Sequence, residues 1–427
     1  MSNNYAGKFV SAETAVKAVQ PGDWVDYGFG AGFPELLDRA LAARRDELTD
    51  VKIRGGLVIR PRIEVVESDP EQKAFSYYSW HIGDYERKLQ TRGLCKFMPM
   101  MLRSLPEMYR HHIRVDVAFV PVSRPDADGC CGLGISNYAW RTIFENARTV
   151  IFEINERLPR LQGVDGSHRV HLSEADFIVE GEHEPLPIRT YRDPSAIDIE
   201  IAKRVVEEIP DGAVLSLGVG GVPFTVANML AQSDKTDLGC HTGTISDAFL
   251  ALYKAGKLTN KKKEIDNGYS TWNLAMGSQE LYDWLDNEPQ LFHPADVDYV
   301  HSPYRIGEMK KCHQYQRWGR AGSDGTGKCR VCRHPTALRY RRTDGFPGGR
   351  IPLRGRQGLY LPCFHPQEKR WLLKIQHRTV HSGRQHRICT AYHDSVRGDR
   401  IRYRKTDRAY LKRTSGCHDR HRTPGFP

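Results

Sequence analysis

The sequence predicts an α/β fold made of two similar domains with largely parallel sheets, the second of which becomes aberrant after about residue 310. Short apolar, β-branched runs that alternate with segments of helical periodicity predict the fold class. A stretch that occurs twice, at a constant offset of 189 residues, predicts the duplication. An abrupt change of charge near residue 310 marks the end of the regular part.

The strand and helix segments follow from their hydrophobic patterns. The strands are expected at residues 115–122, 148–155, 175–181 and 213–220, and two amphipathic helices are expected at 33–48 and 197–209. The strand segments are apolar without a strict polar alternation, which is typical of parallel sheets that helices cover on both faces. An α/β class is the consequence.

The duplication is seen in two stretches that begin at Pro21 and Pro210. PGDWVDYGFGAGFPELLDRAL aligns without a gap on PDGAVLSLGVGGVPFTVANML, so that Val25, Gly32, Pro34 and Leu41 fall on Val214, Gly221, Pro223 and Leu230. Each copy predicts a strand, a Gly-rich turn, a Pro in the first helical turn and an amphipathic helix. A boundary in the irregular segment 182–196 then gives domains at 1–190 and 191–309, followed by a tail at 310–427.

The Gly-rich turns allow two interpretations. Glycine permits a tight corner between strand and helix, in which nothing needs to bind. Alternatively, the exposed N–H groups at the start of the helix receive an anion, such as a phosphate or a developing oxyanion. Neither copy spells G-x-G-x-x-G, so a dinucleotide-binding fingerprint is not supported.

Composition limits the class of protein. At 427 residues and 39% hydrophobic content, the chain can form two or three domains with sizeable cores. No run of about 18 apolar residues predicts a membrane span. The first residues lack the pattern of a secretory signal, so we expect a cytoplasmic protein and no membrane partner. The ten Cys follow no regular framework and are expected to be reduced thiols.

The charge of the chain divides it into two chemically different parts. Residues 310–427 contain 22 Arg and 7 Lys against 6 Asp and 1 Glu, whereas residues 1–309 contain 34 basic and 45 acidic residues. The tail also contains six Cys and nine His, and it sustains neither a helical nor a strand period. Its sequence is therefore not that of an ordinary domain core.

Ordered motifs in both predicted domains carry a family resemblance. GVGGVP (218–223) is followed by DLGCHTGTISD (237–247), which reads as the end of a buried segment, a polar loop and a helix start. The first domain contributes YSWHIGDYERK (78–88), VDVAFVPVSRPDADGCCGLG (115–134) and VIFEINERLPRLQG (150–163). Over about residues 7–309 the chain resembles the acetyl-CoA hydrolase/transferase family, in particular its butyryl-CoA:acetate and 4-hydroxybutyrate CoA-transferases.

The resemblance implies two CoA-transferase-type domains and a ping-pong reaction. A glutamate attacks an acyl-CoA thioester, and the enzyme carries CoA as a glutamyl thioester until a second acid takes it. It implies coenzyme A as a substrate, no tightly bound cofactor and no metal. The partners implied are acyl-CoA and short-chain carboxylates such as butyrate and acetate, and a homo-oligomer is expected. CoA-binding positions are expected at Gly218, Val219, Gly220, Gly221 and Val222.

The family pattern at the catalytic loop is H-[S/T]-E-M, followed shortly by an Asp. His241, Thr242 and Asp247 fit this pattern, but Gly243 occupies the position of the nucleophilic glutamate and Thr244 that of the methionine. Glycine has no side chain that could form the anhydride or the thioester. Each departure needs one base change, so a natural loss and a sequence error are both open.

Three further residues have both a functional and a structural interpretation. His241 is a catalytic candidate, although a single histidine is more often a hydrogen-bonded structural residue. Trp80 and His81 lie in a first-domain stretch that is expected to face the active site, where they would line the acyl pocket, or else they simply pack and cap.

A frame shift near residue 310 is the leading interpretation of the tail. Codons for residues 338–349, read one base later, can give Ser-Gly-Thr-Gly-Gly-Gln-Met-Asp-Phe-Leu-Glu, which matches the family's S-G-x-G-G-Q-x-D-F segment. Residues 320–327 and 355–365 give family-like segments in the same way. Zinc binding is a weaker alternative, in which the ligands come from Cys312, Cys329, Cys332, His313 and His334. The +22 charge could also attract nucleic acid, but we do not expect a specific nucleic-acid partner.

The sequence thus predicts a CoA-transferase that acts on a short-chain acyl-CoA and acetate and is inactive as written, because Gly243 replaces the nucleophile. The alternatives are a CoA-binding pseudoenzyme or weak acyl-CoA hydrolase, and a protein whose basic tail binds nucleic acid.

Overall fold

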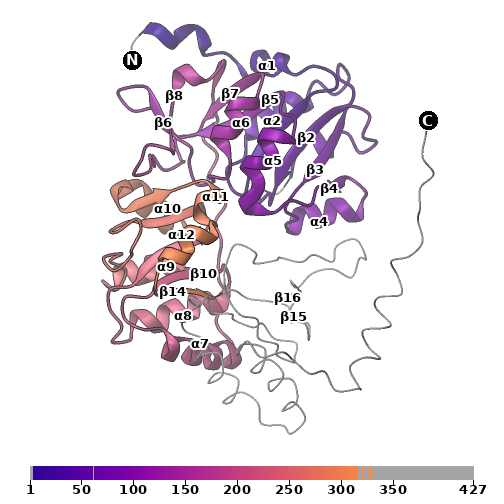
Figure 1. The fold of residues 1–427 in the computed structure, drawn as a ribbon. Helices are drawn as coiled ribbons and strands as arrows, with labels where there is room; N and C mark the ends of the chain where they lie inside the picture. Colours follow the sequence, from indigo (N-terminus) through magenta and orange to yellow (C-terminus); the bar gives the residue numbers. More distant parts are fainter. Residues whose placement is uncertain (1–2, 61, 316–319, 322–326, 329–427) are drawn as a thin grey trace, which may run out of the picture. The chain divides into compact units, whose positions relative to one another are not determined.

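The computed structural model describes residues 3–60, 62–315, 320–321 and 327–328, and Figure 1 shows their arrangement. All of them belong to the compact unit Met1–Lys369, and the unit Arg370–Pro427 lies outside the described residues. The predicted frame shift, zinc ligands and nucleic-acid contacts of the tail therefore fall mostly outside them; of residues 310–427 only 310–315, 320–321 and 327–328 are described, which include the zinc candidates Cys312 and His313.

The first sheet of the described chain has seven strands, all parallel, in the order β4-β3-β2-β1-β5-β7-β9. Its strands are β1 (Trp24–Phe29), β2 (Val51–Gly56), β3 (Phe75–Ser79), β4 (Cys95–Phe97), β5 (Val117–Val122), β7 (Thr149–Ile154) and β9 (Phe177–Glu180). The helices are η1 (Asn3–Lys8), α1 (Ala12–Ala15), η2 (Val16–Ala18), α2 (Glu35–Ala42), α3 (Glu64–Glu67), α4 (Asp84–Thr91), η3 (Leu102–Ser104), α5 (Leu105–His111), α6 (Trp140–Asn146) and η4 (Leu172–Glu174). β6 (Cys130–Gly132) and β8 (Arg169–His171) form a separate antiparallel pair.

The first sheet is buried on both faces, as its apolar strands predict. Val117 and Phe119 of β5 pack into one hydrophobic cluster, and Ala118, Val120 and Val122 pack into another. Since successive side chains of a strand point to opposite faces, each face carries its own core. No face of β5 is left for a polar residue.

Among the described residues the second sheet has five strands, again all parallel, in the order β13-β12-β11-β10-β14. Its strands are β10 (Val214–Leu217), β11 (Gly239–Ile245), β12 (Ser270–Ala275), β13 (Phe292–Pro294) and β14 (Cys312–Tyr315). The helices are α7 (Ala196–Glu208), α8 (Gly221–Ala231), α9 (Asp247–Lys254), α10 (Gln279–Asn287), η5 (Pro289–Leu291), α11 (Val297–Val300) and α12 (Pro303–Glu308). β15 (Arg320–Ala321) and β16 (Gly327–Lys328) pair antiparallel with each other. Because β14 pairs with β10, the second sheet extends past residue 309.

Backbone hydrogen bonds join the two sheets at β12. The N–H of Asn137 donates to the carbonyl of Asn273 at 2.7 Å, and the N–H of Ala275 donates to the carbonyl of Ile135 at 2.8 Å. Ser136 and Leu274 form an antiparallel bridge between these two bonds. The segment 135–137 therefore acts as a short extra strand beside the carboxyl end of β12.

The predicted α/β class with largely parallel sheets is confirmed, and β5, β7, β9 and β10 lie within the segments expected for them. The expected helix at 33–48 is shorter, because α2 ends at Ala42 and turns follow. The predicted polar loop within 237–247 is wrong. Residues 239–245 form β11, which pairs with β12 and passes directly into α9.

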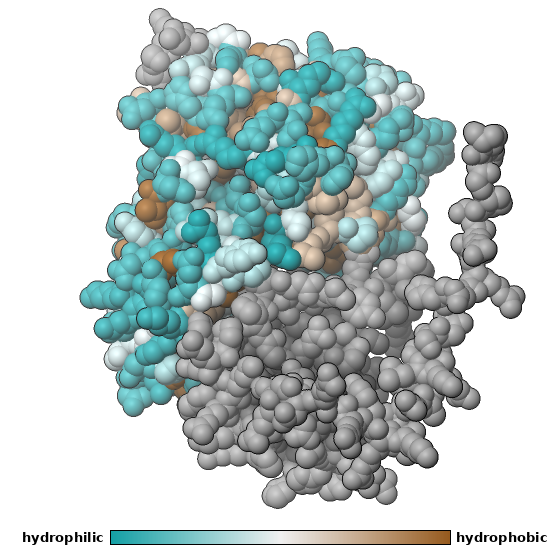
Figure 2. All heavy atoms as spheres, viewed as in Figure 1, coloured by the Kyte–Doolittle hydropathy of each residue, from teal (hydrophilic) through white to brown (hydrophobic). Residues whose placement is uncertain are grey.

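The visible face of the described residues is mainly hydrophilic (Figure 2). The large hydrophobic side chains that are exposed lie on separate elements: Phe9, Met101, Val164, Ile188, Ile197 and Tyr304. Within the described ranges, no helix has the length and apolar character that crossing a membrane requires.

Candidate active site

The second Gly-rich turn opens towards free space. β10 ends at Leu217, and the N–H of Gly218 donates to the carbonyl of Tyr315 at 2.9 Å. Gly220 has a φ of +149°, a conformation that side chains rarely adopt, and α8 begins at the next residue. A Cβ added to Gly221 would meet nothing within 4 Å. The first turn of α8 is therefore accessible to a ligand.

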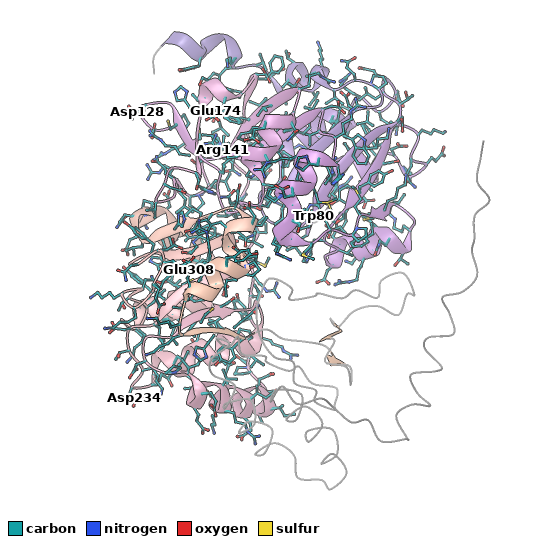
Figure 3. The ribbon with its side chains drawn as sticks, in the orientation of Figure 1. Trp80, Asp128, Arg141, Glu174, Asp234 and Glu308 are labelled. Carbon is teal, nitrogen blue, oxygen red and sulfur yellow. The ribbon has the colours of Figure 1, made fainter. Side chains whose placement is uncertain are left out.

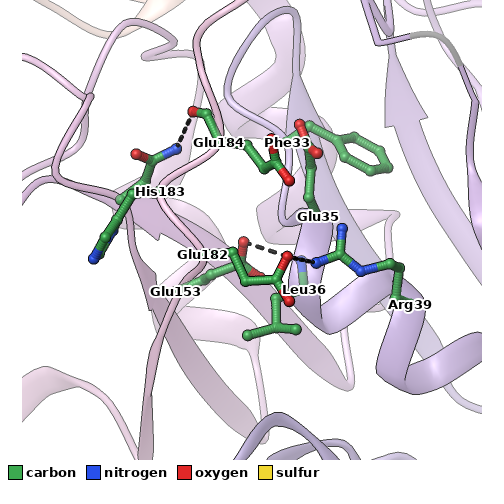
Figure 4. Close-up of a pocket in the computed structure, with 9 residues that line it drawn as sticks. Phe33, Glu35, Leu36, Arg39, Glu153, Glu182, His183 and Glu184 are labelled. Atoms are coloured by element: carbon green, nitrogen blue, oxygen red, sulfur yellow. Dashed lines mark hydrogen bonds and ion pairs between the residues drawn. The ribbon is translucent and has the colours of Figure 1, made fainter.

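The first Gly-rich turn is closed by a carboxylate of the protein itself. Glu153 of β7 accepts hydrogen bonds from the N–H groups of Leu36 and Leu37, at 3.2 and 2.8 Å, in the first turn of α2. Burial raises the pKa of the Glu153 carboxyl to about 7. Figure 4 shows this carboxyl in a pocket that Glu182 and Arg39 also line, where those two side chains form an ion pair.

The two copies therefore differ where their sequences are alike. The N-cap of α8, Gly220, makes no side-chain cap hydrogen bond, whereas Glu153 binds the first turn of α2. Free N–H groups and the helix dipole favour an anion at such a terminus. Of the two turns, the one at Gly220–Val222 has the geometry of an open anion-binding site.

Gly243 lies in β11 and has no catalytic side chain of its own. His301 and Asn273 lie beside it. A Cβ built on Gly243 would lie 2.8 Å from Cε1 of His301 and 3.6 Å from Oδ1 of Asn273. Nε2 of His301 is 3.1 Å from the same Oδ1. The space into which a side chain at position 243 would extend is thus bordered by an imidazole and an amide.

His241 is a buried, neutral histidine. Its Nε2 donates to the carbonyl of Val300 at 2.9 Å, so its Nδ1 carries no proton, and this Nδ1 lies 4.0 Å from Oδ2 of Asp266. Burial, together with the nearby Lys263 ammonium, lowers the pKa of His241 far below its usual value. The ring is 1% exposed. At neutral pH it positions β11 against α11 and holds no extra proton to donate.

Comparisons with known proteins place the chain in a family. Residues 1–189 match the acetyl-CoA hydrolase/transferase N-terminal domain. The chain is 39% identical to the butyryl-CoA:acetate CoA-transferase of Anaerostipes caccae over 71% of this chain and 68% of that enzyme. It is 31% identical to the 4-hydroxybutyrate coenzyme A transferase of Clostridium kluyveri over 76% of this chain and 75% of that enzyme. The chain belongs to the acetyl-CoA hydrolase/transferase family.

Solved structures of this family have the same fold. RipA from Yersinia pestis superposes with a TM-score of 0.69 at 29% identity and covers 76% of both chains. The 4-hydroxybutyrate CoA-transferase from Porphyromonas gingivalis gives a TM-score of 0.58 at 26% identity and covers 73% of both chains. By this relationship the protein is an enzyme of the CoA-transferase class.

A buried cluster of polar side chains around Lys263 is hydrogen-bonded to β11 next to His241. Nζ of Lys263 donates to the carbonyls of Cys240 and Tyr269 and to Oγ1 of Thr271, at 2.8, 2.6 and 2.9 Å. Asp266 accepts hydrogen bonds from Thr271 Oγ1 at 2.7 Å and Tyr299 Oη at 2.6 Å. Burial lowers the pKa of Lys263 to about 8. These side chains tie β11 and β12 together beside His241.

The carboxylate that ends the motif is already engaged. Asp247 begins α9, and its two oxygens each lie 3.1 Å from the backbone nitrogen of Ser278. Its Oδ1 also accepts a hydrogen bond from Oγ of Ser278 at 2.5 Å. The side chain anchors the start of α9 to the start of α10 and is not a free nucleophile.

Trp80, labelled in Figure 3, lies just after β3 in the first domain. Its ring stacks on Phe29 with centroids 4.5 Å apart and lies 6.1 Å from the ring of His81. The indole is 4% exposed, and its Nε1 has no hydrogen-bond partner within the described residues. That Trp80 and His81 line the acyl pocket stays a prediction.

The described residues contain no group of three or more His, Cys, Asp or Glu side chains that could hold a metal ion. Cys312 and His313 are buried in β14, whereas Cys329, Cys332 and His334 lie outside the described residues. The described cysteines are free thiols.

Sequence reasoning did not find His301, Asn273, Lys263 or Asp266. The nearest of them to Gly243 in the chain is Lys263, twenty residues away; parallel pairing of β11 with β12 brings Asn273 to Gly243, and His301 follows α11. The only available signal was their polar character inside otherwise apolar or helical segments.

Proposed function

We propose that the protein is a CoA-transferase that moves CoA between a short-chain acyl-CoA, such as butyryl-CoA, and acetate. The observation that carries the proposal is the open turn at Gly220–Val222, whose counterpart at α2 is closed by Glu153. β10 and β11 are adjacent and parallel, so this turn and the end of β11 lie at the same edge of the sheet. The names of the family relatives supply the substrate class.

The transfer chemistry needs a carboxylate at the end of β11. That carboxylate attacks the thioester carbonyl, the C–S bond breaks, and a mixed anhydride and CoA thiolate form. The thiolate then attacks the enzyme's own acyl carbon, which releases the first acid and leaves an enzyme–CoA thioester. Acetate reverses both steps and leaves as acetyl-CoA. N–H groups at the open turn would bind CoA or stabilise the thioester oxyanion.

In this chain position 243 carries no nucleophile, and the carboxylates of Asp247 and Asp266 in the same region are occupied. Asp247 binds Ser278, and Asp266 binds Thr271 and Tyr299. We infer that the chain as written binds CoA and acyl-CoA without forming the covalent thioester. Loss of a covalent nucleophile lowers turnover by about four to six orders of magnitude.

The test is to incubate the protein with butyryl-CoA, treat it with borohydride or hydroxylamine, and measure its mass. The unaltered chain is expected to show no adduct and almost no transfer of CoA to acetate. An adduct, or a normal rate of transfer, would show that position 243 is not the nucleophile site. Calorimetry with CoA alone tests the binding site independently.

A frame shift in the coding sequence near codon 310 is part of the proposal. Sequencing the coding DNA around codons 243 and 310 tests it. An added or missing base near codon 310 would support it, and an intact reading frame would remove it. A cytoplasmic location and a homo-oligomeric assembly are also proposed, and sedimentation of the purified protein tests the assembly.

Hydrolysis of acyl-CoA is the second candidate function, and the position of His301 favours it. Its Cε1 lies 2.8 Å from the place where the missing Cβ would be, so its imidazole borders the reacting position. Because Nε2 donates to Oδ1 of Asn273, a water molecule there would give its proton to Nδ1 of the imidazole; its oxygen would attack the thioester carbonyl, and the CoA thiolate would leave. Thioester cleavage that does not depend on acetate, and that His301→Ala removes, would support this function.

A further inference from the structure

The side chain of Asn137 is a buried amide without a partner. The residue is 1% exposed, and neither Nδ2 nor Oδ1 makes a hydrogen bond within the described residues. An unpaired buried polar group costs about 1–3 kcal/mol, and buried amides in native proteins are nearly always paired. Such a group is typical of a site whose partner arrives with a ligand or an ordered water.

The backbone around this amide is held firmly. Tyr138 Oη donates to Asp26 Oδ1 at 2.6 Å, and Trp140 Nε1 donates to the Ser136 carbonyl at 3.0 Å. Ser136 Oγ donates to the Phe29 carbonyl, and the N–H of Ala275 donates to the Ile135 carbonyl at 2.8 Å. The N–H of Asn137 itself donates to the carbonyl of Asn273. The side chain of Asn137 is thus presented by a rigid segment and is not left unpaired by a loose one.

The segment also brings Asn137 close to the reacting position. Asn273, to which Asn137 is hydrogen-bonded through the backbone at 2.7 Å, has its Oδ1 3.6 Å from the place where a Cβ on Gly243 would lie. Asn137 and Asn273 are opposed across the antiparallel bridge of Ser136 and Leu274, so their side chains lie on the same face of this strand pair. Asn273 in turn lies beside the position at which the family carries out its chemistry.

We propose that the Asn137 amide binds the acyl group of the substrate. Nδ2 would donate to the thioester carbonyl oxygen, or to a carboxylate oxygen of the free acid, and Oδ1 would accept from a water or hydroxyl of the bound substrate. This inference rests on the proposed function and adds a first-domain residue that binds the acyl group of the ligand. Binding of CoA itself belongs to the turn at Gly220–Val222.

The experiment compares Asn137→Leu with Asn260→Leu in the full chain. Asn260 is a buried asparagine whose side chain is fully engaged: its Oδ1 accepts from the Cys240 N–H at 2.8 Å and its Nδ2 donates to Ser270 Oγ at 3.0 Å. Calorimetry gives the dissociation constants of CoA and of butyryl-CoA for each variant, and thermal unfolding gives Tm.

Asn137→Leu is expected to leave CoA affinity within about twofold and to weaken butyryl-CoA binding by about three- to tenfold, the value of one hydrogen bond. Its Tm should stay constant or rise by a few degrees, because an apolar group of similar shape replaces an unsatisfied amide. Asn260→Leu should lower Tm by several degrees, because it removes both side-chain hydrogen bonds and also places leucine at a φ of +57°.

A fall in Tm for Asn137→Leu like that of Asn260→Leu, with the ratio of the two dissociation constants unchanged, would overturn the proposal and make Asn137 a structural residue. If the unaltered chain bound no CoA, both the proposed function and this inference would be refuted. If Asn137→Leu bound CoA normally and kept the same preference for butyryl-CoA, this inference alone would be refuted.

Discussion

The imidazole of His301 lies against the Cα of Gly243, with its Cε1 2.8 Å from the position of an ideal Cβ. A distance below 3.0 Å between a real Cβ and another heavy atom is essentially never seen, so any side chain at position 243 must displace this ring. The two positions are therefore coupled, although 57 intervening residues separate them in the sequence.

Gly243→Ala is expected to destabilise the protein by about 1–3 kcal/mol, because the new methyl group overpacks the site. In a background of His301→Ala the same change should cost much less, since the ring is gone. Urea unfolding of the two single variants and the double variant measures the coupling. Additive changes in the free energy of unfolding would mean that the His301 ring moves aside at little cost.

For activity, Gly243→Glu alone is expected to leave transfer nearly undetectable. The carboxylate would have to share its space with His301, and the family's Gly-Gly-Gln segment is absent from the sequence as written. Restoring that segment together with Gly243→Glu should produce the trapped glutamyl-CoA adduct. Full activity from the single change would refute the need for oxyanion partners.

Gly221→Val is expected to weaken CoA binding without unfolding the second domain, since its side chain would enter open space at the start of α8. Gly7→Val is the matched control, because Gly7 is exposed and its Cβ would also meet nothing within 4 Å. Calorimetry with CoA should show a loss of at least tenfold for Gly221→Val and none for Gly7→Val. Equal affinity of both variants would exclude the turn as the CoA site.

Glu153→Gln is expected to stabilise the protein more at pH 8 than at pH 5. Burial raises the pKa of Glu153 to about 7 in the folded state, while the unfolded value is near 4.5. The folded state therefore binds the proton more tightly, and stability from this group is present below about pH 4.5 and is lost as pH rises through about 7.

Glutamine keeps an acceptor for the N–H groups of Leu36 and Leu37 and does not ionise. Denaturant unfolding at the two pH values measures the difference, which we expect to be on the order of 1 kcal/mol or more; a difference that does not vary with pH would contradict the buried-acid assignment.

His241 predicts the opposite pH dependence for the second domain. Its folded-state pKa lies below the ordinary value of 6.5, so it contributes stability that is present above about pH 6.5 and is lost as pH falls towards the folded pKa. His241→Gln should reduce this acid sensitivity at some cost in stability at pH 7. Hydrogen exchange of the β11 amides between pH 7 and pH 5 provides the measurement, and identical pH profiles for both proteins would assign the effect elsewhere.

The strands and the duplication were predictable because their signal is local. Val117–Val122 is apolar at every position, and Thr149–Ile154 is apolar except at Thr149 and Glu153, as expected for strands covered on both faces. β11 was not predictable beyond Cys240, since a polar run around Gly243 reads as a loop. The strand conformation of these residues is stabilised by pairing with β12, in which Thr242 is opposite Trp272 and Thr244 is opposite Leu274, and not by their own strand propensity.

The site was predictable only as far as the motif extends along the chain. The position of Gly243 and the turn at Gly220 follow from sequence, whereas His301 and Asn273 reach them through sheet pairing and the α11 connection. Likewise, nothing in a strand containing one Glu indicates that Glu153 binds the start of α2, 116 residues earlier.

Glu153 has a further consequence for how the two halves of the chain have diverged. Its side chain is held by the chain itself at the first turn of α2, in the place that an external anion could take at the first turn of α8. Truncating that side chain would leave the N–H groups of Leu36 and Leu37 without this acceptor, while Glu35, Glu182 and Glu184 would still line the pocket around them. These remaining acidic side chains would repel a small carboxylate, so the loss of Glu153 alone would not make the first turn of α2 equivalent to the open first turn of α8.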